Sequence, residues 1–204
     1  MIRLTISVLL LVTTLAEARP FKASVTIPKD RFVAIHGPIT DLTPHIQKVR
    51  ALASKSNRAI YLDIDSPGGG ILTMFAFVQV MEEAKGLGIP FICVVRSLAA
   101  SAAFSILNEC DVRYAFSASL LLWHPGSGFL MQQIGAEELE RLMIQLKTLD
   151  AHIVRRLKSN LKIDDEVFDR HFRAETFHTP ESLNELSPNY MRVLRRVTYT
   201  GATK

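Results

Sequence analysis

The sequence predicts an α/β domain, because segments with the two-residue period of strands alternate with segments of helical period, joined by short connections. An apolar run at 89–95 has the length of a strand and no polar face, as expected for a parallel sheet covered on both sides. No linker-like stretch divides the chain after residue 18. We therefore expect residues 19–204 to form a single domain.

The first half of the chain predicts two strand–helix pairs. Residues 32–35 are apolar and predict a strand, and the next helix begins at Thr43-Pro44, an N-cap residue followed by a first-turn proline. Residues 59–64 carry the β-branched and aromatic side chains typical of a strand. A run of glycines then leads into a helix over 72–85, whose apolar residues recur with helical spacing.

The second half continues the alternation after the strand at 89–95. Small residues from Ala99 onward are expected to open a short helix that ends before Cys110. The dense charges of a long helix over 136–159 predict a peripheral position for it. The remaining expected elements are strands over 112–115, 119–123 and 193–199, and a helix that starts at Thr179-Pro180.

The first 18 residues have the pattern of an export signal. Arg3 provides a positive charge, residues 4–16 are mostly apolar, and Ala16-Glu17-Ala18 is a small-x-small cleavage pattern. The apolar stretch is shorter than the roughly 18 residues that a membrane-spanning helix needs. We expect a cleaved signal peptide, residues 1–18, and a periplasmic or secreted mature chain; an uncleaved membrane anchor is the alternative.

The net charge and the spacing of the histidines limit the classes of partner and cofactor that we expect. The net charge of +4 is modest, and the densest basic cluster, in the tail, is unaccompanied by an aromatic platform or a nucleic-acid motif. We expect a solvated face there and no nucleic-acid partner. The six histidines show no His-Glu-x-x-His spacing, so neither a metal nor another cofactor is expected. The basic cluster consists of Arg192, Arg195, Arg196 and Lys204.

The two cysteines, Cys93 and Cys110, flank Ser101 almost symmetrically. In an oxidising compartment they can form a disulfide bond if strand and helix run antiparallel. Two buried free thiols are the alternative, because the pairing depends on a geometry that sequence does not give.

The most informative segment is the glycine run in Asp65-Ser66-Pro67-Gly68-Gly69-Gly70. Glycine permits positive φ and has no Cβ atom, so these residues let a substrate approach backbone amides closely. We expect Gly68 and Gly70 to contact substrate and Gly69 to donate a hydrogen bond. A plain tight turn is the alternative interpretation of the same residues.

Ser101 and His124 complete a candidate acyl-transfer site. Ser101 is predicted where an apolar strand gives way to a helix, beside the backbone amide of Ala102. A structural N-cap is the alternative role for that serine, and Ser97 or Ser105 could take its place. His124 follows a predicted strand, where a catalytic base can be displayed, although a structural histidine fits equally well. Nucleophile, base and amide donors are the minimum set for a serine hydrolase.

Three segments resemble the proteolytic subunit of the Clp protease and, more broadly, the Clp/crotonase superfamily: residues 64–69, 99–104 and 121–125. The resemblance extends over residues 32–186. It implies a stack of strand-strand-helix units, serine peptidase activity on a peptide or protein, and a homo-oligomer. It also implies that Ser101 attacks the carbonyl, that His124 takes its proton, and that the Gly69 and Ala102 amides form the oxyanion hole.

The third catalytic residue departs from the family pattern. The family places an aspartate on a short strand a few residues before a segment like Thr179-Pro180, and the corresponding position here is Ala174. Glu175, beside it, is the preferred candidate to orient His124, ahead of Asp169. The family's glycine-rich strand after the histidine is reduced here to residues 126–128. That change, and the lack of ATP outside the cytoplasm, argue against ring assembly with an unfolding ATPase.

Three other interpretations remain. Lys147 could replace His124 as the base if burial or nearby positive charge lowered its pKa, but acidic residues surround it in the sequence. A noncatalytic binding protein with an incomplete triad is the main alternative to a peptidase. Acyl-CoA chemistry, known in the wider superfamily, fits poorly with an exported chain.

Overall fold

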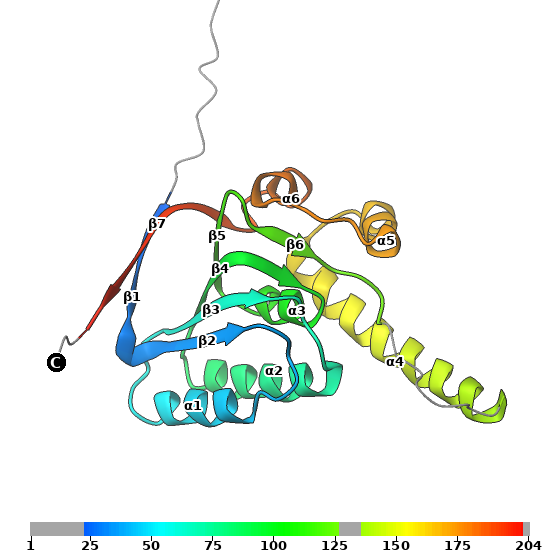
Figure 1. Ribbon diagram of the computed structural model, residues 1–204, viewed down its shortest axis with the longest axis horizontal. Coiled ribbons are helices and arrows are strands. Elements are labelled where there is room, and N and C mark those ends of the chain that lie inside the picture. Colours follow the sequence, from blue (N-terminus) through cyan, green and yellow to red (C-terminus); the bar gives the residue numbers. More distant parts are fainter. Residues whose placement is uncertain (1–22, 127–135, 202–204) are drawn as a thin grey trace, which may run out of the picture.

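The computed structural model describes residues 23–126 and 136–201, which form a parallel β-sheet flanked by helices (Figure 1). Six of the seven strands follow the order β1-β7-β5-β4-β3-β2, and the seventh, β6, pairs with β4. This arrangement confirms the predicted α/β class. The expected signal peptide, residues 1–18, lies outside the described residues, and no helix among those described is long and apolar enough to cross a membrane.

The elements alternate along the chain as the sequence predicts. The strands are β1 (Ala23–Pro28), β2 (Phe32–His36), β3 (Ile60–Ser66), β4 (Phe91–Ala100), β5 (Val112–Phe116), β6 (Leu120–Leu122) and β7 (Arg192–Thr200). The helices are α1 (Thr43–Ala53), α2 (Ile71–Gly86), α3 (Ala102–Asn108), α4 (Ala136–Leu161), α5 (Asp165–Ala174) and α6 (Pro180–Leu186), and a 3-10 turn, η1 (Lys29–Arg31), joins β1 to β2.

The central strand β4 determines where the site lies. Its first half pairs with β5, its last residues 98–100 pair with β6, and β3 runs along its other side. All these pairings are parallel, so the carboxyl ends of β3, β4 and β6 meet at one edge of the sheet, where ligands of open α/β sheets bind. The glycine run, Ser101 and His124 follow these three strands directly.

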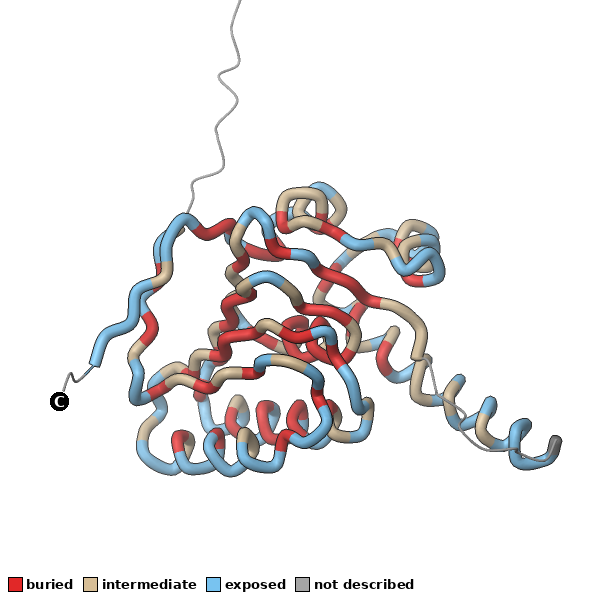
Figure 2. The backbone as a smooth tube through the Cα atoms, viewed as in Figure 1, coloured by how far each residue is buried: buried red, intermediate tan, exposed pale blue. Residues whose placement is uncertain are grey.

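Apolar side chains are buried on both faces of the sheet, as the run at 89–95 predicts. The larger core lies between the sheet and the helices, and a smaller one lies on the opposite face, where β1 and β7 contribute (Figure 2). Val95 belongs to the first core and Val94 to the second. The long helix α4 is peripheral only in its first half, because Ile153, Leu157 and Leu161 are buried.

Three element predictions need correction. Ala99 and Ala100 belong to β4 and do not open the following helix, because pairing with β6 extends the strand. Thr43 is the first residue of α1 and Leu42 its N-cap, since the Thr43 amide is held by the Asp41 carboxylate at 2.8 Å. Strand β1 was not predicted, because it depends on pairing with the distant strand β7.

The segment before Thr179 is a helix and a loop, where the family resemblance implied a short strand bearing the catalytic acid. Asp164 caps α5 by accepting hydrogen bonds from the amides of Glu166 and Val167. Phe168 and Phe172, four residues apart, bury the inner face of this helix. The predicted helix start at Thr179 is confirmed, since Thr179 and Ser182 form a reciprocal capping box.

Candidate active site

The glycine run packs directly against the turn that carries Ser101. Gly68 has a φ of +94°, and a Cβ atom placed there would lie 2.5 Å from the Ala100 carbonyl oxygen and 2.7 Å from Ser101 Cβ. Gly69 has a φ of +149°, and its Cβ position is blocked by the backbone of Ile39. Both glycines are therefore required by close backbone approach as well as by conformation.

Hydrogen bonds fix the orientation of this loop. The Ile39 amide donates to the Gly68 carbonyl at 2.8 Å, and the Gly70 amide donates to the Ile39 carbonyl at 2.7 Å. The buried Ser66 hydroxyl accepts from the Gly68 amide at 3.1 Å and donates to the Gly37 carbonyl at 2.6 Å. Within the described residues the Gly69 amide has no protein acceptor, which leaves it available to a ligand.

Ser101 occupies a strained backbone conformation between β4 and α3. Its φ of 55° and ψ of −124° lie outside the regions that L-residues ordinarily adopt. Such strain persists only where the surroundings hold it, and a serine on a sharp strand-to-helix turn is typical of a displayed nucleophile. Its amide donates to the Leu122 carbonyl at 2.9 Å, and its own carbonyl accepts from the Ser105 amide at 3.1 Å.

The turn also presents a second amide. Ala102 is the first residue of α3, so its N–H has no acceptor within the helix. The Ser101 side chain makes no capping hydrogen bond, which argues against the purely structural N-cap role. Of the alternative serines, Ser97 donates to the Asp65 carboxylate and Ser105 to the Ser101 carbonyl.

An open groove of about 680 Å³ brings the glycine run, Ser101 and His124 together. His124 follows β6, and its side chain is mostly buried. In the described part of the chain no hydrogen bond joins Ser101 to His124, as is common for catalytic pairs without substrate. A smaller apolar recess of about 20 Å³ lies beneath Ser101, lined in part by Ile71, Met74 and Trp123.

Glu175 is the carboxylate that the structure places beside His124. Its Oε1 lies 3.9 Å from His124 Nδ1, a buried atom that has no hydrogen-bond partner in the described structure. The distance permits an ion pair but exceeds a hydrogen bond. Glu175 ends α5 in the left-handed conformation with a φ of 49°, and its side chain is 61% exposed. Asp169 instead pairs with Lys158 of α4 at 3.3 Å.

Buried rings behind the site connect the two chain segments that carry His124 and Glu175. His178 pairs with Leu121 of β6 through two backbone hydrogen bonds of 2.8 and 2.9 Å. Its ring stacks on Trp123 with 4.6 Å between centroids, and the His171 ring lies 4.8 Å away. Burial, together with His171, lowers the pKa of His178 to about 4. Sequence reasoning missed this cluster, since nothing in the spacing of the histidines indicates it.

Other candidates lie apart from the groove or support it indirectly. Lys147 is exposed on α4 and does not line the groove. Asp150 on the same helix, which the sequence analysis did not single out, accepts a hydrogen bond from the Gly126 amide at 2.7 Å and so holds the loop after His124. Among residues 23–126 and 136–201 there is no cluster of three or more metal-ligating side chains. Residues 127 and 128 of the glycine-containing loop lie outside the described part.

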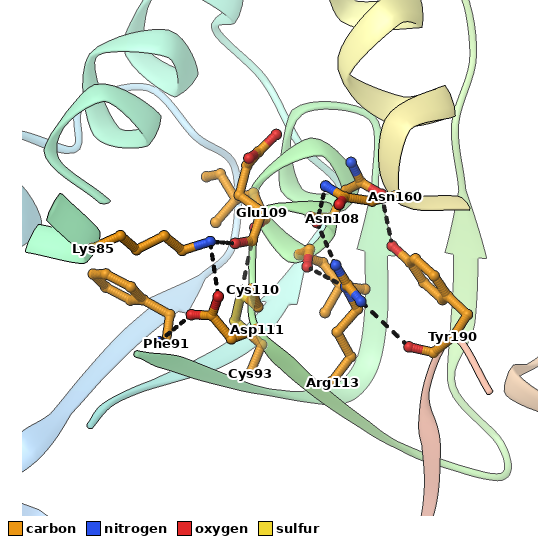
Figure 3. The surroundings of a disulfide bond; sticks show 12 residues. Lys85, Phe91, Cys93, Asn108, Glu109, Cys110, Asp111, Arg113, Asn160 and Tyr190 are labelled. Carbon is orange, nitrogen blue, oxygen red and sulfur yellow. Dashed lines mark hydrogen bonds and ion pairs between the residues drawn. A yellow bond between two sulfur atoms is a disulfide. The ribbon is translucent and has the colours of Figure 1, made fainter. Parts of the chain in front are cut away.

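The cysteines are joined: a disulfide bond links Cys93 of β4 to Cys110, just after α3 (Figure 3). Their Cα atoms are 6.0 Å apart, within the usual range for such bonds. The sequence left open a disulfide bond or two buried free thiols, and the structure has the disulfide bond.

The fold and groove define an α/β protein that displays a serine at a strand-to-helix turn, with a histidine and a glycine loop at the same sheet edge. The family model described as Clp protease matches residues 16–185. This chain therefore belongs to the Clp protease family, and serine peptidase activity is the general expectation for it. No match was found among curated proteins.

Proposed function

We propose that this chain is an exported serine peptidase in which Ser101 is the nucleophile and His124 the general base. The observation that carries the proposal is the shared groove, where the strained turn at Ser101, His124 and the glycine run face one space. The family assignment supports the general activity.

The first chemical step is attack of Ser101 Oγ on the carbonyl carbon of a peptide bond, while His124 accepts the hydroxyl proton. Negative charge develops on the carbonyl oxygen. The amides of Gly69 and Ala102 are the proposed donors to it, because neither has another protein acceptor among the described residues. These dipoles are held in place by the Ile39 contacts and by α3, so they need little reorganisation during reaction.

The second half of the reaction releases the two products. Protonated His124 gives its proton to the departing amine, and the C–N bond breaks to leave an acyl ester on Ser101. Water then attacks the ester with His124 again as base, which releases the acid product and restores the hydroxyl. Gly68 and Gly70, which line the groove, are the proposed contacts for the substrate backbone.

Glu175 is the proposed orienting acid. Its carboxylate favours the tautomer with a proton on His124 Nδ1 and stabilises the imidazolium formed during attack. A side-chain rotation that closes the 3.9 Å gap would also satisfy the unpaired Nδ1 atom. We propose that substrate binding favours this closed arrangement.

The proposed substrate is a peptide or protein with a small apolar side chain next to the cleaved bond. The recess beneath Ser101 is apolar and its free volume of about 20 Å³ is small, so a bulky side chain would have to displace Met74 or Ile153. Export to the periplasm or the exterior is supported by the Cys93–Cys110 disulfide, since such bonds persist in oxidising compartments. A homo-oligomer without an ATPase partner remains part of this proposal.

A fluorophosphonate probe, which reacts with activated serines, tests the proposal. We expect labelling of the mature parent protein, and at least a thousandfold slower labelling of Ser101→Ala and His124→Ala. Lys147→Met is the matched control and should react like the parent, because that lysine lies away from the groove. No labelling of the folded parent between pH 5 and pH 10 would refute the peptidase proposal.

A noncatalytic binding protein is the second candidate, and the unpaired His124 Nδ1 beside an exposed Glu175 favours it. Such a protein would hold a peptide in the groove without cleaving it. Two results together would support this candidate in place of the peptidase. The folded parent protein would bind peptides without being labelled by the probe, and Gly70→Trp, which fills the groove, would abolish the binding.

A further inference from the structure

The disulfide bond encloses the turn that carries Ser101. Cys93 lies eight residues before Ser101 on β4, and Cys110 lies nine residues after it, at the end of α3. Strand, turn and helix therefore form a covalently closed ring with Ser101 near its middle. Both cysteines are essentially fully buried.

The helix inside this ring is short and begins directly after Ser101. α3 has seven residues, far fewer than the roughly 12 to 15 that an isolated helix needs to be even marginally stable. Its first amide, that of Ala102, is one of the two proposed oxyanion donors. A shift at the far end of so short a helix therefore changes where this amide and Ser101 point.

The contacts at the far end of α3 are otherwise noncovalent (Figure 3). The Arg113 guanidinium donates to the Leu107 carbonyl at 3.1 Å and to the Asn108 carbonyl at 2.6 Å. The Asp111 carboxylate accepts from the Phe91 amide at 2.7 Å, which ties the chain after Cys110 to the start of β4. Each of these hydrogen bonds contributes modestly to stability and can open, whereas the bond between the sulfurs is covalent.

We propose that the Cys93–Cys110 disulfide is a redox-dependent clamp that holds Ser101 and the Ala102 amide in their reactive geometry. With the bond reduced, the strained φ of 55° at Ser101 relaxes, and the nucleophile and its oxyanion donor lose their alignment. The inference rests on the proposed peptidase function. Such a clamp keeps the peptidase inactive in a reducing compartment and makes it active once export exposes the enzyme to an oxidant.

Closing the clamp is a thiol–disulfide exchange with a disulfide oxidant, either a protein or a small molecule. The thiolate of one cysteine attacks the oxidant, forms a mixed disulfide and releases the oxidant's first thiolate. The thiolate of the second cysteine then attacks the first cysteine's sulfur, which forms the bond between the two cysteines and releases the oxidant's second thiolate. The two cysteines lose two protons and two electrons, and the oxidant leaves as two thiols. Cys110 lies beside an open groove of about 460 Å³, and because its side chain is buried in the folded chain, the exchange requires local opening on that side.

The test compares the oxidised and the reduced parent protein. A phosphine reduces the bond to two thiols and is itself oxidised to a phosphine oxide with oxygen from water. Fluorophosphonate labelling is then measured against probe concentration, at a temperature where circular dichroism shows both forms folded. We expect the maximal labelling rate to fall between tenfold and a hundredfold in the reduced form, because a misplaced nucleophile loses that much. The probe concentration for half-maximal rate should stay unchanged, and glutathione disulfide should restore the fast rate.

The double variant Cys93→Ala/Cys110→Ala provides the matched control. It should label slowly whether or not reductant or glutathione disulfide is present, which separates the clamp from other effects of these reagents. If the double variant fails to fold, the reduced parent alone tests the clamp. The reduced parent keeps all its side chains and lacks only the disulfide bond.

Each outcome separates the proposals. An unchanged maximal rate in the reduced, folded parent would overturn the clamp while leaving the peptidase intact. A slower rate that merely follows the unfolded fraction would also overturn it, because the bond would then serve stability alone. No labelling of the oxidised parent would contradict the proposed function itself, and the clamp would fall with it.

Discussion

The two sides of the candidate site are held in different ways. On the nucleophile side, Gly68 packs against the backbone of Ala100 and Ala102 and against Ser101 Cβ, and the disulfide closes the surrounding ring. On the acid side, the Glu175 side chain is 61% exposed and lies 3.9 Å from His124. The first side is fixed by main-chain atoms that few substitutions can replace.

This difference bears on how the chain resembles its family. A backbone donor requires one loop shape, and the glycine run and the small residues around Ser101 are the segments that resemble the family motif. An orienting carboxylate requires only a negative charge near His124 Nδ1, and a glutamate on a longer arm can supply it from a helix end. His178 then fixes the segment behind Glu175 by its pairing with β6 and its stack on Trp123.

The largest effect is expected from filling the space between the glycine run and the serine turn. Gly68→Ala introduces a Cβ atom 2.5 Å from a carbonyl oxygen at a φ of +94°, so we expect a loss of about 3 kcal/mol or more in unfolding free energy. Labelling of Ser101 should fall with it. Urea denaturation and probe kinetics measure the two effects.

Gly70→Ala is the control within the same loop. Its φ of −59° is ordinary, and the nearest atom to an added Cβ is the Thr73 hydroxyl at 3.2 Å, which can move. We expect the unfolding free energy to change by less than about 1 kcal/mol. Equal losses in both variants would contradict the close packing of Gly68 against the serine turn.

A smaller effect is expected on the acid side. Glu175→Gln keeps the size of the side chain but cannot stabilise the His124 imidazolium, so the labelling rate should fall between tenfold and a hundredfold. That is less than the roughly 10⁴-fold known for a buried triad acid, because water partly screens this exposed carboxylate. Asp169→Asn removes only a surface pair with Lys158 and should label like the parent. Equal rates in the two variants would remove Glu175 from the triad.

The smallest effect concerns the rings that support the acid side. The pKa of His178 is about 4 in the folded chain, below the value near 6.5 of an unfolded chain, so the unfolded state binds more protons between these values. The unfolding free energy should therefore fall as the pH drops from 7.5 to 5, with His178 accounting for about 2 kcal/mol.

His178→Phe tests this contribution, since phenylalanine keeps a stacked ring on Trp123 but binds no proton. Urea unfolding of parent and variant at pH 7.5 and pH 5 gives the comparison. The variant should lose less stability on acidification than the parent. Parallel losses would mean that His178 is not the group that titrates.

Much of the framework could be predicted because its signals are local. The alternating periods indicate the α/β class, the Thr179-Pro180 start indicates α6, and local patterns place the glycine run, Ser101 and His124 directly after predicted strands. Helix α5, which was not predicted, also carries local signals, namely the Asp164 cap and the Phe168 and Phe172 pair. Periodicity, capping and turn chemistry depend on neighbours within a few residues, so sequence alone determines them.

Tertiary structure alone decided the features that depend on distant partners. β1 exists because β7, far along the chain, pairs with it, and β4 extends to Ala100 because β6 lies beside it. The same holds for the Cys93–Cys110 bond and for the choice of Glu175 over Asp169 as the neighbour of His124. Spacing along the chain cannot give these results, because each depends on distances and directions in space that only the packed sheet and helices set.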